Sequence, residues 1–407
     1  MAPIRTAIIG LSGNSASSWA SAAHLPYLLS KRGRTNYQIV ALCNSSVEAA
    51  KQAIEEYSLP TNTKAYGNPD DLAQDADIDL VVVVTRVDVH YKTALPSIRA
   101  GKKVFVEWPL AQDVKHAQEL ADAAAAYGSH TLVGHQGRFA PVLLKVREVL
   151  ESGRIGKVLS SDVRAFDTFT KRDALGAGAA YFADLTIGGN GLTITFGHCM
   201  FDSNYPKKAC FSKCDSNSSI LAVFDQVQHV LGDLQNPKAS LQLLRPQLKL
   251  IDAATTKVTG EVTSNVPDLL IVSGSLHASK IVQQGATLSL HYRRGGGFKG
   301  DAPLVWTING EKGELRLTAE NGPTVHAASV KEAVSIEVHD YETDTVEKVD
   351  WDWSGWETEL PLISRSIGTL YDKFSNGSDD AKDGLPTFQT ALQRHKQLEE
   401  ILLQWRA

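Results

Sequence analysis

The first 135 residues alternate short apolar runs with segments of helical spacing, and this rhythm restricts the possible folds more than any other feature. The third run is apolar on both faces, as expected for a central strand of a parallel sheet. Strands alternating with helices predict an α/β fold, a doubly wound parallel sheet covered by helices on both faces. The five predicted strands are 5–11, 37–44, 79–85, 102–107 and 130–135.

The rhythm changes after residue 135. Residues 140–156 have the apolar spacing of one long helix, and the segments that follow alternate apolar and polar residues. This predicts a second α/β domain with a large, mostly antiparallel open sheet. We therefore expect one domain over 1–135 and another over 136–407. The predicted strands are 157–167, 239–252, 268–276, 286–295, 304–310 and 313–320, and a closing helix spans 388–405.

Composition narrows the classes of protein further. The net charge is -5 over 407 residues, and no lysine- or arginine-rich run is present, which argues against direct nucleic-acid binding. No apolar stretch approaches the roughly 18–20 residues that span a bilayer, and the N-terminus has no cleavable signal pattern. We expect a cytoplasmic protein, with the nucleus as the alternative. Four cysteines in so long a chain do not predict a disulfide framework.

A glycine loop follows the first predicted strand. Gly10 lies near its end and Gly13 three residues later, with Ser12 at the place of the usual second glycine. In dinucleotide-binding folds such glycines permit a tight turn and a close approach of the backbone to the pyrophosphate. The loop alone is weak evidence, but its position between a strand and a helix favours a dinucleotide cofactor.

The end of the second strand leaves the choice of cofactor open. An acidic residue there would accept a hydrogen bond from the ribose 2′-hydroxyl of NAD. Asn44 and Ser45 carry no charge that would repel the 2′-phosphate of NADP, and no arginine is present to hold it. The sequence therefore predicts binding of NAD or NADP.

Four stretches together resemble one known family. Residues 10–26, 85–111, 137–158 and 308–317 are similar, in order, to the glucose–fructose oxidoreductase and inositol dehydrogenase (Gfo/Idh/MocA) family. The resemblance implies a Rossmann domain, followed by an α/β domain whose open sheet covers the substrate cleft and often forms an oligomer interface. We therefore expect a homo-oligomer, most simply a dimer, that acts on a small molecule.

The resemblance also assigns cofactor contacts. It implies that Thr85 and His90 face the cofactor, and that Glu107 lies near the nicotinamide ribose or carboxamide. Trp108 stands where the family's dehydrogenases carry a lysine that helps to move a proton, and an indole N–H cannot exchange a proton near neutrality. Trp108 either lines the cofactor pocket as an aromatic wall or only packs.

A second family signature is also altered. The family pattern is a glycine-rich turn, then an aspartate, then a histidine four residues later. Here residues 188–198 end in His198, and Ile194 takes the place of the aspartate. His198 is the first candidate for an acid–base group because its unperturbed pKa lies near 6.5, although a structural role is an equal alternative. Tyr181 is a second candidate proton donor.

Residues 199–222 look like an insertion directly after His198. They contain three of the four cysteines, but the spacing matches no zinc pattern, so we predict no metal site. The segment is either an inserted loop or a retained intron in the gene sequence.

Two functions follow from the resemblance. The first is an NAD(P)-dependent oxidoreductase acting on a sugar-like, polyol or other small carbonyl or hydroxyl metabolite, in a fungal setting that includes secondary metabolism. The second is a catalytically silent, NAD(P)-binding regulator that contacts a transcription activator. Trp108 and the stretch 195–198 favour the second, because they resemble the fungal branch that contains the galactose-regulon co-repressor.

Overall fold

The structure, a computed structural model, divides into two compact units. Unit 1 comprises residues 1–136, 186–189 and 354–396, and unit 2 comprises residues 137–185, 190–353 and 397–407. The two units are described separately below. The described residues are 2–12, 18–168, 171–194, 223–252, 254–325, 330–353, 355–377 and 384–406.

Unit 1 is built on a six-stranded, fully parallel sheet. Its order β3-β2-β1-β4-β5-β6 is that of a Rossmann fold, so the predicted α/β class is confirmed. Strand β3 was not predicted, because it has only three residues and lacks a buried apolar run. The strands are β1 (Ile4–Ile9), β2 (Tyr37–Cys43), β3 (Lys64–Tyr66), β4 (Leu80–Val83), β5 (Lys103–Val106) and β6 (Thr131–Val133).

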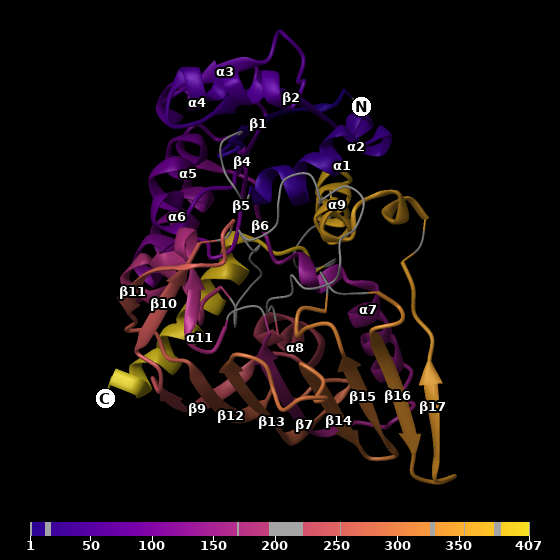
Figure 1. Ribbon diagram of the computed structural model, residues 1–407. Coiled ribbons are helices and arrows are strands. Elements are labelled where there is room, and N and C mark those ends of the chain that lie inside the picture. Colours follow the sequence, from indigo (N-terminus) through magenta and orange to yellow (C-terminus); the bar gives the residue numbers. More distant parts are fainter. Residues whose placement is uncertain are drawn as a thin grey trace. The chain divides into compact units, whose positions relative to one another are not determined.

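Helices cover both faces of this sheet. Helices α5 and α6 lie on one face, and α1 and α9 on the other (Figure 1). Local sequence fixes several helix ends: the Ser46 hydroxyl caps α3, the Asp113 carboxylate caps α6, and Gly128 ends α6 in a left-handed conformation. The longer helices of unit 1 are α3 (Val47–Glu56), α5 (His90–Arg99), α6 (Val114–Tyr127) and α9 (Leu362–Ser375); shorter ones are η1 (Ala20–His24), α1 (Leu25–Leu29), α2 (Lys31–Asn36), α4 (Pro69–Ala73), η2 (Val87–Val89) and η6 (Gly355–Glu359).

Helix α9 joins unit 1 although it lies far along the chain. The ring of Tyr371 stacks on Tyr27 with centroids 5.5 Å apart and meets Tyr37 edge-on at 5.1 Å. The Tyr37 hydroxyl donates to the carbonyl of Tyr371 at 2.6 Å. The sequence analysis places all residues after 135, including α9, in a second domain. Apolar periodicity reveals a helix but not the unit against which the helix packs.

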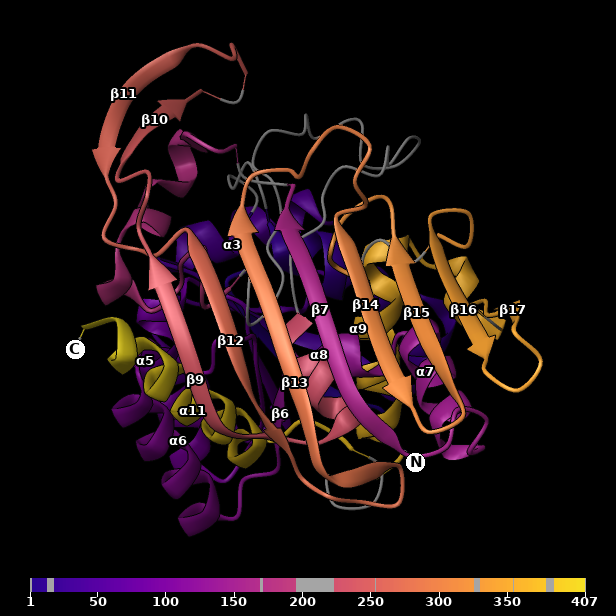
Figure 2. The same ribbon diagram turned by 90° about the horizontal axis from the view of Figure 1, so that it is seen from below.

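Unit 2 is dominated by an eight-stranded sheet in which only β7 and β13 pair in parallel. This agrees with the predicted large, mostly antiparallel sheet. Helices α7 (Pro141–Glu151) and α8 (Val223–Leu231) lie on one face, and no described helix of unit 2 covers the other (Figure 2). In sheet order the strands are β17 (Thr345–Val349), β16 (Val334–Asp340), β15 (Gly313–Ala319), β14 (Leu304–Gly310), β7 (Val158–Asp167), β13 (Val282–Arg294), β12 (Leu269–Leu276) and β9 (Leu234–Gln242).

A smaller, three-stranded sheet completes unit 2. Its order is β11-β10-β8, formed by β11 (Val258–Thr263), β10 (Gln247–Ile251) and β8 (Ala174–Gly176). The single strand predicted over 239–252 is therefore two strands in different sheets. Residues 243–246 separate them, and Pro246 in this connection cannot donate a ladder hydrogen bond.

The C-terminal helix α11 (Phe388–Arg406) contributes residues to both units. Within unit 2 the amide of Gln404 accepts from the N–H of Ala239 at 2.9 Å and donates to the carbonyl of Pro237 at 2.8 Å. These bonds satisfy backbone groups of β9, the outermost strand, and so protect a sheet edge that could otherwise pair with another chain.

Candidate cofactor-binding site

The turn after β1 accepts only glycine at position 10. Gly10 has φ +101°, and a Cβ added there would lie 2.2 Å from the carbonyl oxygen of Val84. Its N–H donates to the carbonyl of Cys43 at 3.1 Å, which ties the turn to the end of β2. Ser12 lies in the described part of this loop, whereas Gly13 lies outside the described residues. The close approach of two backbones gives Gly10 the role of the first glycine of a dinucleotide fingerprint.

The end of β2 supports the same loop. The side-chain amide of Asn44 donates to the carbonyl of Leu11 at 2.8 Å, and the hydroxyl of Tyr57 donates to the carbonyl of Ser12 at 3.2 Å. Ser45 is exposed on the adjoining turn, and no acidic residue stands beside it at 44–46. Asn44 therefore positions the loop, and Ser45 remains the uncharged candidate for the ribose.

Thr85 and His90 lie after β4, and His90 links two turns. Its ring nitrogens lie 2.9 Å from the carbonyl of Thr85 and 2.8 Å from that of Pro109. Burial lowers the pKa of His90, although both carbonyls favour its charged form. With both ring nitrogens occupied, His90 stabilises the two turns. The buried hydroxyl of Thr85 has no hydrogen-bond partner among the described residues, so it is the polar atom here that a ligand could satisfy.

Glu107 is held on several sides at the end of β5. Its side chain is nearly buried, and one carboxylate oxygen lies 2.9 Å from Nε2 of His24. The other ring nitrogen of His24 lies 2.8 Å from the hydroxyl of Tyr371. Burial raises the pKa of Tyr371 well above its usual value, so the hydroxyl stays protonated and donates to the imidazole. A Cβ on Gly134 would lie 2.5 Å from the Glu107 carboxylate, so any other residue there would force this carboxylate to shift.

Trp108 is only 4% exposed and packs between two imidazoles. Its ring centroid lies 4.6 Å from that of His135 and 4.6 Å from that of His395. The Trp108–Pro109 peptide bond is cis. The contacts with His135 and His395 therefore support the interpretation that Trp108 packs. Its role as a wall of the cofactor pocket stays a prediction.

The two predicted acid–base residues belong to another part of the chain. Tyr181 lies in unit 2, in the 3₁₀ segment η4 (Ala177–Ala183), with its ring edge-on to Phe182 at 4.8 Å. It packs against a small apolar cluster that includes Ile194, which is 4% exposed. A carboxylate at position 194 would be buried among apolar side chains, which explains why isoleucine suits this structure. His198 and the insertion 199–222 lie outside the described residues.

Four of the predicted cofactor contacts come together at one edge of the unit 1 sheet. Gly10, Asn44, Thr85 and Glu107 directly follow, or nearly follow, β1, β2, β4 and β5. In parallel sheets, ligands bind outside the carboxyl ends of the strands. The residues therefore suit a dinucleotide, with Glu107 at the deepest, most constrained position. His24, Gly134, Tyr371 and His395 support this edge and were not predicted, since their partners are distant in sequence.

Two known domain families match this architecture. Residues 4–135 match the model of the Gfo/Idh/MocA oxidoreductase family, described as an NAD-binding Rossmann fold. Residues 218–319 match the C-terminal domain of Gal80p. The first domain is therefore similar to the Gfo/Idh/MocA family and part of the second to the C-terminal domain of Gal80p, which confirms the resemblance seen in the sequence.

Relatives of both functional kinds are similar to most of the chain. The dehydrogenase aclE of Aspergillus oryzae is 27% identical over 98% of this chain and 95% of its own length. The galactose/lactose metabolism regulatory protein GAL80 of Saccharomyces cerevisiae is 27% identical over 79% of this chain and 68% of its own length. Overall sequence similarity alone therefore does not separate an enzyme from a regulator.

Solved structures show the same fold. A super-repressor mutant of Gal80p from Saccharomyces cerevisiae superimposes with a TM-score of 0.79 at 24% identity, covering 99% of this chain and 96% of its own. An NAD-binding oxidoreductase from Klebsiella pneumoniae gives 0.70 at 19% identity, covering 100% and 98%. Among the described residues, no helix combines the length and apolar character that a membrane crossing needs.

Proposed function

We propose that this protein is an NAD(P)-dependent oxidoreductase that acts on a sugar-like, polyol or other small carbonyl or hydroxyl metabolite. The observation that carries the proposal is the Gly10 turn, where backbone geometry excludes any side chain at the end of β1. The likeness to the dehydrogenase aclE over nearly the full length of both chains supports the catalytic part.

The proposed chemistry divides between the cofactor and the protein. A bound nicotinamide would supply or accept the hydride, while the protein must move a proton at the substrate oxygen. Trp108 cannot do this, so we assign the proton transfer to His198, with Tyr181 as the second candidate. Glu107, fixed by His24, would orient the nicotinamide ribose or carboxamide.

A silent regulator is the second candidate, and one observation favours it specifically. Both family catalytic positions that depart from the pattern, Trp108 and Ile194, carry apolar side chains packed into their surroundings. In this alternative the protein binds NAD(P) and contacts a transcription activator, in keeping with the match to the Gal80p C-terminal domain.

Cofactor binding is tested with two glycine variants. Gly10→Ala places a Cβ against the carbonyl of Val84, whereas the Cβ of Gly128→Ala meets nothing within 4 Å, although both glycines have positive φ. We expect fluorescence titration with NADH and NADPH to show binding to the wild type and to Gly128→Ala, and binding at least about tenfold weaker to Gly10→Ala. Equal affinities in all three proteins would contradict the assignment of the loop.

Turnover is tested separately, by following NAD(P)H absorbance with a panel of sugars, polyols and small carbonyl compounds. His198→Gln should lower the rate by about 10²–10⁴-fold if His198 moves the proton. Unchanged turnover in this variant would show that another group moves the proton, and Tyr181→Phe would then be the next variant to test. Tight cofactor binding without turnover on the whole panel would refute the oxidoreductase, and capture of an acidic activator segment would then support the regulator.

A further inference from the structure

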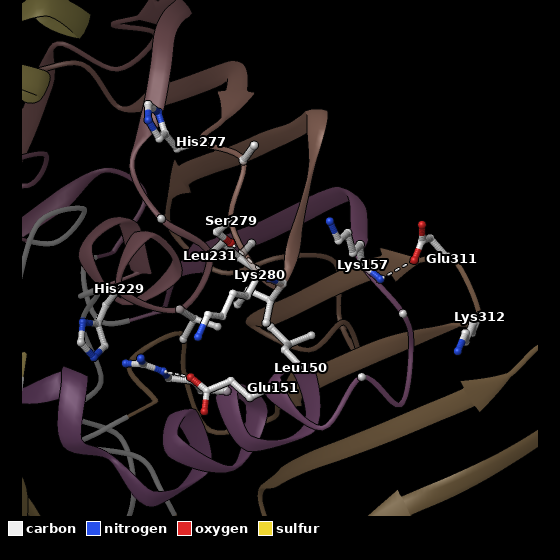
Figure 3. Close-up of a pocket in the computed structure, with 17 residues that line it drawn as sticks. Leu150, Glu151, Lys157, His229, Leu231, His277, Ser279, Lys280, Glu311 and Lys312 are labelled. Carbon is white, nitrogen blue, oxygen red and sulfur yellow. Dashed lines mark hydrogen bonds and ion pairs between the residues drawn. The ribbon is translucent and has the colours of Figure 1, made fainter.

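A second concave site lies wholly within unit 2. It has a volume of about 880 Å³ and is formed where α7 and α8 end, together with the connections 153–157, 277–281 and 311–312 (Figure 3). This volume lies within the range of pockets that bind small organic molecules. All of its lining residues belong to unit 2, whereas the candidate dinucleotide site belongs to unit 1.

The pocket is positively charged in an otherwise acidic protein. Arg147, Lys157, Lys280 and Lys312 contribute four cationic side chains, against two carboxylates, which leaves an excess of two positive charges (4 − 2). The chain as a whole carries -5. A local field of this sign, opposite to that of the molecule, attracts anions to a defined place.

Both carboxylates in the pocket are already engaged. Glu151 accepts from the guanidinium of Arg147 at 2.7 Å, and Glu311 accepts from the backbone N–H of Lys157 at 2.8 Å. In the part of the chain that the structure describes, the ammonium groups of Lys157, Lys280 and Lys312 have no carboxylate partner. Three cations around one hollow therefore remain available to a ligand.

The negative ends of α7 and α8 explain only part of this charge. Helix C-termini favour cations, but the effect falls off within the last turn. Arg147 and His229 lie on the helices and suit that role. The three lysines come from connections outside these two helices, and Lys280 extends across the pocket toward Glu151 (Figure 3). Stabilisation of the helix ends does not require all three.

The walls of the pocket are fixed by their own hydrogen bonds. The hydroxyl of Ser279 accepts from the N–H groups of Ile281 at 3.3 Å and Val282 at 3.2 Å. The N–H of Lys312 donates to the carbonyl of Ile155 at 2.8 Å. The pocket is therefore preformed, and these backbone groups are not free for a ligand. Buried apolar side chains also line it, namely Leu150, Val230 and Leu231.

We propose that this pocket binds a small phosphate ester, with the phosphate held by Lys157, Lys280 and Lys312 and the organic part occupying the rest of the pocket volume. Lysine ammonium groups are compact point charges that suit phosphate oxygens. A free phosphate ion would use only part of a pocket of this size. The site is separate from the proposed oxidoreductase chemistry.

The test uses two triple variants of the full chain that remove the same charge. Calorimetric titration at low salt follows the binding of phenyl phosphate and of inorganic phosphate to each protein. The control lysines are exposed, belong to unit 2 and do not line this pocket. The pocket variant is Lys157→Gln, Lys280→Gln, Lys312→Gln, and the control variant is Lys257→Gln, Lys299→Gln, Lys348→Gln.

We expect phenyl phosphate to bind the wild type more tightly than inorganic phosphate does. Its affinity should fall by roughly tenfold or more in the pocket variant and stay unchanged in the control, because charge-assisted hydrogen bonds are lost only in the first. Equal weakening in both variants, or no saturable binding to the wild type, would overturn the site. Equal affinities for the two probes would overturn its assignment to an ester. Matched thermal unfolding of the variants excludes a folding defect as the cause.

Discussion

His395 shows how a single buried side chain can make this protein sensitive to acid. It lies against the indole of Trp108, and burial lowers its pKa to about 4, although Asp113 acts in the opposite direction. In an unfolded chain the pKa of histidine is about 6.5. Between these two pH values the imidazole is protonated in the unfolded chain but not in the folded protein. The free energy of unfolding therefore decreases as the pH falls from about 6.5 toward 4.

We therefore expect His395 alone to remove about 2 kcal/mol of unfolding free energy between pH 7 and pH 5. Urea unfolding of the wild type and of His395→Gln at both pH values measures this as a difference in slope with pH. His116→Gln serves as the control, since His116 lies at a partly exposed helix start beside Asp113. An equal pH dependence in the wild type and His395→Gln would show that His395 is charged in the folded protein or not buried.

Residues of the candidate site could be predicted only where a local sequence pattern marks their positions. Gly10, Asn44 and Glu107 stand at or near the ends of predicted strands, so position along the chain was enough to select them. His24 and Tyr371 were not predictable, because the contacts that fix Glu107 join residues 83 and more positions apart. Trp108 was recognised as a departure from the family pattern, but its two imidazole neighbours come from separate elements.

At the scale of elements, we expect the turn between β2 and α3 to set the choice of cofactor. Asn44 is occupied with the glycine loop and the Ser46 hydroxyl caps α3, so Ser45 is the one position of this turn whose side chain has no assigned structural task. A carboxylate there would accept from a ribose 2′-hydroxyl and repel a 2′-phosphate.

Ser45→Asp should accordingly shift preference toward NADH. We expect the ratio of the NADPH to the NADH dissociation constant to rise by about tenfold or more, as measured by fluorescence titration. Ser45→Asn provides a neutral control of similar size and should leave the ratio nearly unchanged. A shift of the same size in the control would place the ribose elsewhere.

Strand prediction succeeded where apolar residues form a run or a clear alternation. It failed for β11 and β17, whose side chains are mostly exposed and therefore carry no apolar pattern. Strand β16 was also not predicted, although its buried and partly exposed residues alternate. The structure identifies it through its antiparallel pairing with β15. Strands β11 and β17 lie at the margins of their sheets, whereas β16 is an inner strand, and the short strands β3 and β8 were likewise not predicted.

At the scale of the whole molecule, the large sheet of unit 2 offers a face for assembly. A shallow hollow of about 270 Å³ lies on strands β7, β12, β13 and β14, and Ile271 at its margin is 46% exposed. No described helix of unit 2 covers this face (Figure 2). The family resemblance implies a dimer through the open sheet. Ile271 is the exposed large apolar side chain of this hollow, and the other side chains that line it are mostly polar, namely Asp162, Arg164, Ser289, His291 and Thr307.

We expect Ile271→Arg to weaken that dimer, because it would bury an unpaired charge in the interface. Light scattering coupled to size exclusion should show a lower average mass at micromolar concentration. Leu403→Arg, an equally polar change at an exposed position of α11, should leave the mass unchanged. A monomeric wild type, or a dimer that both variants retain, would contradict the assignment of this face.

The packing of Tyr371 against Tyr27 and Tyr37 also has a consequence for biosynthesis. The ribosome delivers the chain from its N-terminus, and most domains fold as soon as their residues have emerged. Here the aromatic layer that closes one face of the Rossmann sheet arrives some 330 residues after the strands it covers, since Tyr37 and Tyr371 are 334 positions apart. During synthesis, this face of the Rossmann sheet therefore lacks the contacts of Tyr371 until translation is nearly finished.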